Sequence, residues 1–435
     1  MPSLTGPGKP GTGTPQQNRG GQLPDTGRRS WHRRAGRPVS FWLFALILTG
    51  IGSALGWVND TRWLLIHMVT LGLVSTSIMV WGQHFTEALL KTRLAAQTRA
   101  SQVRRIQLLT VSTLITCAGM LLYLPYLTAL GAVGAGGALA WYAAALSAQV
   151  RAALPARFTM VVRFYIAAAC LMPVGALFGA ILAFPQAGPW HGRLVVAHMA
   201  VNILGFVVIT AIGTLVTLWP TVLRTPLLQG DEHRTRYVLY LLLAAVAVMV
   251  AASLAGLPFA VALGAGIYAC ALVFFLVLMV RTAWTRPPRS FAALSMASAM
   301  VWLTGCTLML AVFAATAPDM ILLGYYARSL TLPLVAGFLL QLLFGAMSYL
   351  MPVVMGGGPK VAKVTFAAMD RAPRLRVALA SLALGLILFS PASLPTFAWA
   401  GVLLGGGLII FFVYGMLDMV RCFVREKKLV DAQQS

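Results

Sequence analysis

Two histidines interrupt apolar stretches of the chain in the same way. The segments "RWLLIHM" and "RLVVAHM" share the pattern Arg-x4-His-Met, and they place His67 and His198 131 positions apart. A neutral imidazole can bind haem iron or copper through one ring nitrogen while a hydrogen-bond acceptor holds the other. The alternative is a hydrogen-bonded packing histidine, which is the usual fate of a lone one. Repetition in an apolar setting favours a cofactor or metal site, because ionisable groups inside membranes are usually functional.

Polar residues that accompany these histidines extend the candidate site. Arg62 and Arg193 begin the two segments, and Arg328 begins a third, comparable one. Guanidinium groups in these places are suited to pair with the propionates of a haem, although they would also suit the lipid headgroup region. Asn202 follows His198 by four residues and therefore shares its helix face, where it can orient the imidazole or contact a ligand.

A second site at the other end of the same helix is also conceivable. His84 lies 17 residues beyond His67, about 25 Å along a helix, so the two cannot share a cofactor. In the repeat described below, His84 aligns with Met347, which suggests His/Met ligation. The alternative is a polar helix end that meets the headgroups. Met68 and Met199 follow the first two histidines and are either soft copper ligands or packing residues.

The elements that position these residues are apolar helices. Of the 435 residues, 59% are hydrophobic and 10% are charged, a composition typical of an integral membrane protein. Runs of roughly 20 apolar residues can span a bilayer as helices. The predicted spans are 40–58, 63–89, 105–125, 127–149, 158–184, 193–221, 237–256, 258–281, 290–316, 320–353, 375–391 and 395–420. The fold class predicted is therefore all-α, with about twelve transmembrane helices.

The net charge of +23 follows the membrane topology, and nucleic acid is not an expected partner. Basic residues gather before span one and in alternate loops, and the other loops hold almost none. The positive-inside rule then places both termini in the cytoplasm of a bacterial cell, with the protein in the plasma membrane. We expect a disordered tail at 1–38, a membrane domain at 39–424 and a short cytoplasmic tail at 425–435.

An internal repeat organises the predicted membrane domain. The segment from Gly205 to Pro220 matches the segment from Gly337 to Pro352 at an offset of 132. The segment "PYLTALGA" from Pro125 matches "PFAVALGA" from Pro258, and Pro391 stands at the equivalent position of the third repeat. Offsets of this size correspond to four spans each. The chain is therefore predicted to hold three four-helix pseudo-repeats, at about 39–150, 156–282 and 289–424. A transporter of two six-helix halves would show a different period.

These features resemble subunit I of the haem–copper oxidases. The resemblance implies that His67 is a low-spin haem ligand and that His198 is a copper ligand. The paired histidines that this family has in spans seven and ten are absent from 237–256 and 320–353, so no oxygen-reducing binuclear centre is implied. The chain more closely resembles the NnrS-like proteins, which are associated with haem, copper and nitric oxide stress. It resembles most of all the membrane domain of cupredoxin-associated actinobacterial "copper oxidases", through "HFTEALL", "RAALPARF", "HGRLVVAH", "GTLVTLWPTVLRT" and "GAMSYLMPVVMGGGP".

The resemblance leads to a haem-b-binding electron-transfer subunit as the first hypothesis. The subunit would pass electrons from membrane quinol to an extracytoplasmic cupredoxin or multicopper protein, and would itself be a non-catalytic part of an oxidoreductase. Because the chain ends at Ser435, the copper partner is expected to be a separate protein. Two alternatives stay open, a transporter or sensor for copper or nitric oxide, and a redox-silent membrane anchor for a copper enzyme.

Overall fold

The computed structural model describes residues 37–434, except 59, 93–95, 155, 157, 187, 227–230 and 392. Nearly all of the predicted N-terminal tail, 1–38, lies outside the described residues. Every regular element within them is helical. In chain order the helices are α2 (Arg37–Ala54), α3 (Thr61–His67), η2 (Met68–Val74), α4 (Ser75–Leu89), α5 (Ala96–Leu121), α6 (Pro125–Ala152), α7 (Thr159–Leu182), α8 (Trp190–Met199), η3 (Ala200–Val208), α9 (Ile209–Leu223), α10 (Asp231–Ala255), α11 (Pro258–Thr285), α12 (Phe291–Thr316), α13 (Met320–Ser329), η4 (Pro333–Leu340), α14 (Gln341–Met355), α15 (Gly358–Met369), α16 (Pro373–Leu388) and α17 (Thr396–Gln434).

Ten helices in the described part of the chain are long and apolar enough to cross a membrane. This agrees with the predicted class, an all-helical multi-pass membrane protein. The other two predicted spans, 105–125 and 375–391, are helical as α5 and α16 but are not among the ten. α16 has only 16 residues, about 24 Å of helix, which is short for a hydrocarbon layer of about 30 Å. α5 begins with polar and basic residues, including Arg104 and Arg105.

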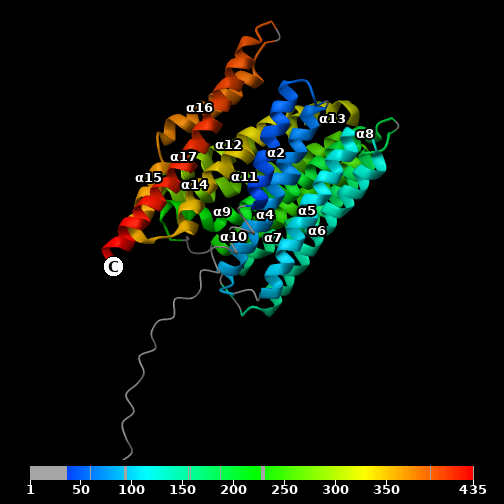
Figure 1. Cartoon of the computed structure of the whole chain (residues 1–435). Coiled ribbons are helices and arrows are strands. Elements are labelled where there is room, and N and C mark those ends of the chain that lie inside the picture. The colour runs from blue at the N-terminus through cyan, green and yellow to red at the C-terminus, as the bar shows by residue number, and fades with distance from the viewer. Residues whose placement is uncertain are drawn as a thin grey trace, which may run out of the picture.

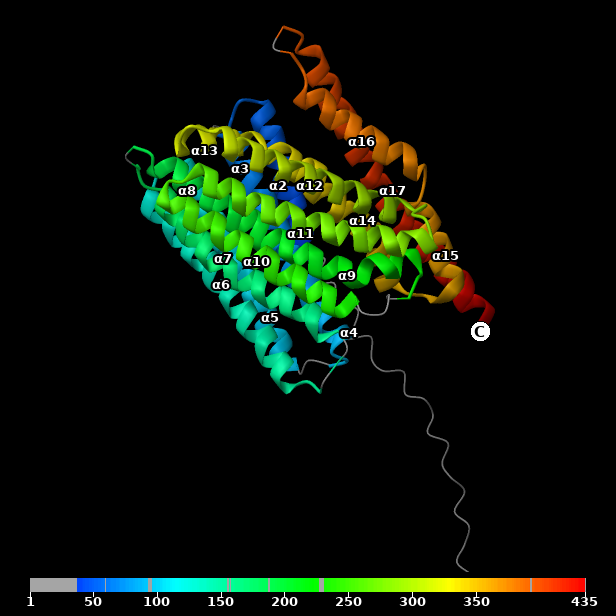
Figure 2. The ribbon, with the colours of Figure 1, turned by 180° about the vertical axis from the view of Figure 1, so that it is seen from behind.

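The long helices pack side by side in one bundle (Figures 1 and 2). Chain neighbours contact each other extensively, namely α5 with α6, α6 with α7, α10 with α11, and α11 with α12. α16 and α17 form a hairpin at the edge of the bundle, and the tip of this hairpin projects away from it in both views. Large apolar side chains such as Phe389 and Leu403 remain exposed on the hairpin, as suits a surface that faces lipid.

Three long helical stretches contain a π-helical segment. The segments η2, η3 and η4 begin at Met68, Ala200 and Pro333, which are 132 and 133 positions apart. π segments interrupt the regular hydrogen bonding of a helix and often occur at functional sites. The stretches at 61–89 and 190–223, which carry the two candidate histidines, are also the most deeply buried of the candidate spans. They form the centre of the bundle.

Helix boundaries follow local sequence signals. Pro125 and Pro258, from the repeated motif, each stand at the first position of a helix, where proline lacks only an N–H that would have no partner. Pro391 does not continue this pattern, because α17 begins only at Thr396. α15 was not predicted. It arises because Gly356 and Gly357 adopt positive φ angles of 67° and 96°, which end α14 and turn the chain.

Candidate metal centre

The imidazole rings of His67 and His198 lie side by side. Their centroids are 6.4 Å apart, and their planes are inclined by 32°. His67 is the last residue of α3, and His198 is the penultimate residue of α8, so each lies within two residues of the start of a π segment. The sequence left open whether the two histidines share a site. The structure brings them together.

Both rings are held through the same nitrogen. Nδ1 of His67 lies 2.9 Å from the carbonyl oxygen of Trp63, and Nδ1 of His198 lies 2.9 Å from the carbonyl oxygen of Gly175. A carbonyl oxygen only accepts, so this network assigns the proton of each neutral ring to Nδ1. Each Nε2 then carries a lone pair. A metal-binding histidine needs this tautomer and this kind of support.

Packing fixes the orientation of both rings. The indole of Trp63 stacks on His67, with ring centroids 3.8 Å apart. Helix α7 approaches His198 closely, because a Cβ at Gly179 would lie 2.9 Å from Cε1 of the imidazole. Asn202, which was expected to orient His198 or to contact a ligand, donates from Nδ2 to the His198 carbonyl oxygen at 2.9 Å. Its Nδ2 also lies 3.2 Å from Nδ1 of His198, but a protonated Nδ1 does not accept a hydrogen bond from it. A side chain at Gly175 would collide with this amide.

The two rings are not completely enclosed by side chains. His67 and His198 are both half-buried, and each has one buried neighbour in the sequence, Met68 and Ala197 respectively. In the described part of the chain, no group of three or more His, Cys, Asp and Glu side chains is placed to hold a metal ion.

Two of the three predicted arginines lie close together at the end of the bundle nearest the histidines. Arg62 donates from Nη2 to the carbonyl oxygen of Arg328 at 2.8 Å, and the Arg328 guanidinium contacts Nε2 of His191. Together, these two contacts link the first turn of α3 to α13, and α13 to the start of α8. His191, the second residue of α8, thereby joins this cluster.

Arg193 has a different role from the one its motif suggests. Its Nη1 donates to the carbonyl oxygen of Leu254 at 3.1 Å, in the last turn of α10, and its guanidinium lies over the ring of Trp190. Gly256, with φ of 80°, leaves the space that the guanidinium fills. Carbonyl groups at a helix C-terminus lack partners within the helix, so Arg193 stabilises that end.

The predicted second pair, His84 and Met347, stays a prediction. His84 is exposed on α4, where it meets the edge of Trp81 with ring centroids 5.8 Å apart. Met347 is half-buried on α14 and packs against the cluster that includes Phe291 and Met369. The two methionines next to the central histidines also point elsewhere. Met68 accepts a hydrogen bond from Thr49 of α2, and Met199 packs on the main core.

Sequence reasoning missed the residues that support the imidazoles. Trp63 precedes His67 by four residues, which places it on the same helix face, and this spacing was a usable signal. Gly175 and Gly179 form a small-x3-small pattern, which marks close helix contacts in membranes. Neither pattern shows by itself which histidine it serves, because α7 and α8 must first be placed against each other.

The fold and this site define a class, an all-helical multi-pass membrane protein with a pair of imidazoles between its central helices. No family model matches the chain, and no curated protein or solved structure matches it either.

Proposed function

We propose that His67 and His198 are the two protein ligands of one metal centre. A metal–nitrogen bond to imidazole is about 2.0 Å long, so two imidazoles on opposite sides of one ion have ring centres roughly 6 Å apart. The observed separation of 6.4 Å agrees with this geometry. Proximity alone does not distinguish ligands from packing histidines. The matched hydrogen bonds from both Nδ1 atoms to carbonyl oxygens, which leave both Nε2 atoms available, carry the proposal.

Haem b is the group that this pair fits best. The two imidazoles suit the axial positions of a six-coordinate haem iron, and haem so ligated exchanges single electrons. Both histidines are half-buried, so part of each remains accessible. Arg62 and Arg328 are cationic groups at the same end of the bundle and suit the haem propionates. The hydrogen bonds of Arg193 to α10 make it the least suitable of the three arginines.

The wider function follows from the class of site and from the resemblance to haem–copper oxidases. We infer an electron-transfer subunit in the bacterial plasma membrane, with both termini in the cytoplasm. The chain would take electrons from quinol and pass them to an extracytoplasmic cupredoxin or multicopper protein. A shared centre changes the roles that the resemblance implies, because His198 then ligates the same metal as His67.

Copper is the second candidate. Two imidazoles on opposite sides can hold one copper ion, and imidazole is a suitable ligand for it. The specific observation in its favour is that the described residues offer these two ligands without a third. This version corresponds to a copper transporter or sensor rather than to an electron-transfer subunit.

We further propose that the bundle consists of three four-helix pseudo-repeats, within a twelve-helix membrane domain. The three π segments recur at the predicted period. Equivalent glycines also make equivalent contacts with the preceding helix. A Cβ at Gly205 would lie against Leu171 of α7, and one at Gly337 would lie against Trp302 of α12. The glycines are 132 positions apart and their partners 131 apart.

Metal titration distinguishes the two candidates. The full-length chain, prepared in detergent from cells starved of haem, would be titrated with hemin and separately with Cu(I). We expect one haem per chain, the spectrum of a six-coordinate low-spin iron, and no stoichiometric copper. One copper per chain without haem binding would overturn the haem assignment and select the transporter or sensor. Binding of neither would overturn the metal centre itself.

A further inference from the structure

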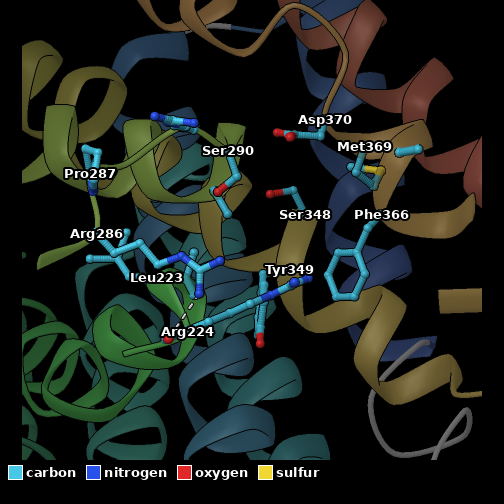
Figure 3. Close-up of a pocket in the computed structure, with 14 residues that line it drawn as sticks. Leu223, Arg224, Arg286, Pro287, Ser290, Ser348, Tyr349, Phe366, Met369 and Asp370 are labelled. Atoms are coloured by element: carbon cyan, nitrogen blue, oxygen red, sulfur yellow. Dashed lines mark hydrogen bonds between the residues drawn. The ribbon is translucent and has the colours of Figure 1, made fainter. Parts of the chain in front are cut away.

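A cavity of about 520 Å³ opens at the end of the bundle opposite the histidine pair. Four segments that are distant in the sequence line it, namely the end of α9, the loop from α11 to α12, the last turns of α14, and the end of α15 with the residue after it. Figure 3 shows these segments around one opening. These segments lie at the end of the bundle that carries the loops rich in basic residues.

Three arginines give this cavity its charge. Arg224, Arg286 and Arg289 all line it, and all three are exposed. Arg224 ends α9 in a left-handed conformation with φ of 56°, and its carbonyl oxygen accepts from Nη1 of Arg286 at 3.3 Å. This contact uses one donor of Arg286 and leaves most of its guanidinium for a ligand. Guanidinium groups match the geometry of phosphate oxygens.

The one carboxylate in the lining is already engaged. Asp370 accepts from the backbone N–H of Phe291, and the guanidinium of Arg376 lies near it. Burial raises the pKa of the Asp370 carboxyl above its usual range, against the lowering effect of these two neighbours. Arg376 offsets part of the charge of Asp370, and the three lining arginines outnumber this one carboxylate.

Hydroxyl groups and an apolar wall complete the lining. Ser290 accepts a hydrogen bond from Ala293 and keeps its own proton to donate. Its oxygen faces the same space as those of Ser348 and Asp370 (Figure 3). The Tyr349 hydroxyl has a long contact of 3.5 Å with a carbonyl oxygen, which a better acceptor can replace. Phe366 adds an apolar surface beside these donors.

We propose that this cavity binds a phosphate group, carried either by an anionic membrane lipid or by a free phosphate compound. Three guanidiniums and hydroxyl donors recognise the phosphate, and the adjoining apolar wall suits the glycerol and first acyl carbons of a lipid. Basic pockets between helix ends on the positively charged side of a membrane protein bind anionic headgroups in this way. The site is separate from the histidine pair and does not depend on the proposed metal centre.

Native mass spectrometry of the full-length protein tests this site. The protein would be titrated with phosphatidylglycerol, with phosphatidylcholine and with pyrophosphate. We expect phosphatidylglycerol to bind about tenfold more tightly than phosphatidylcholine, because both carry the phosphate but the choline cation of phosphatidylcholine offsets its attraction to the three arginines. The double variant Arg286→Gln/Arg289→Gln should lose this preference. Raising the salt concentration should weaken it in the unmodified protein, which tests the charge without a substitution.

The control variant is Arg281→Gln, which removes an exposed arginine of α11 that does not line the cavity. This variant should keep the preference. Pyrophosphate binding that only the double variant loses, without a preference among lipids, would assign the site to a free phosphate compound. Equal loss in Arg281→Gln, or no preference for any of the three probes, would overturn the proposal.

Discussion

Replacement of either His67 or His198 by alanine is expected to remove the low-spin haem spectrum of the purified protein. Each imidazole supplies one of two axial ligands, so either variant leaves the iron with at most one protein ligand. Loss of an outer-shell partner already weakens metal binding 10- to 100-fold, and loss of a direct ligand should lower the haem content to roughly a tenth or less. The reduced-minus-oxidised difference spectrum and the haem content per chain measure this.

The double variant separates one shared site from two independent ones. Groups that act as a unit give non-additive effects, so His67→Ala/His198→Ala should lose no more haem than either single variant. His84→Ala is the matched control, because His84 is exposed on the distal part of the same helical stretch. It should keep the full spectrum. Half of the haem in each single variant, and none in the double, would instead indicate two separate centres.

Gly192→Ala is expected to lower the free energy of unfolding by about 3 kcal/mol, the upper end for overpacking at a close contact. A Cβ at this position of α8 would collide with the carbonyl oxygen of Met320, and Gly324 of α13 faces Gly192 in the same crossing. Backbone atoms cannot rotate away as a flexible side chain can, so α8 and α13 must separate. Unfolding of the detergent-solubilised protein in SDS measures the loss.

A glycine without such a neighbour provides the control. Gly137 of α6 is exposed, and a Cβ there would meet nothing within 4 Å. Gly137→Ala should therefore leave the stability unchanged or raise it by up to about 1 kcal/mol, the gain in helix propensity. A similar loss in both variants would mean that glycine itself, rather than the crossing of α8 and α13, sets the stability.

The fold class and the choice of His67 and His198 as candidates were accessible from the sequence because both depend on local patterns, whereas their meeting at one place was not. The length of an apolar run reports a membrane helix directly, and ten of the predicted spans correspond to helices that qualify. The repeated Arg-x4-His-Met pattern gave His67 and His198 the same depth in their helices. Equal depth is necessary for two residues to meet, and the structure shows that these two do.

The remaining features depend on how helices rotate and pack, which local patterns do not specify. Arg193 repeats the position of Arg62 in the motif, yet it contacts α10 because that helix ends beside it. His84 and Met347 were paired by alignment, but the environments of the two differ, because His84 is exposed on α4 and Met347 is half-buried against an apolar cluster. Arg224 and Arg286 likewise meet at one cavity only when the end of α9 is placed beside the loop between α11 and α12.

Electron paramagnetic resonance of the oxidised protein, purified from haem-replete cells and combined with iron analysis, tests the shared metal centre most directly. The account predicts one iron per chain, in the low-spin ferric state of a haem with two imidazole ligands. A high-spin signal would contradict the paired ligation by His67 and His198. Iron far below one per chain would contradict the haem centre altogether.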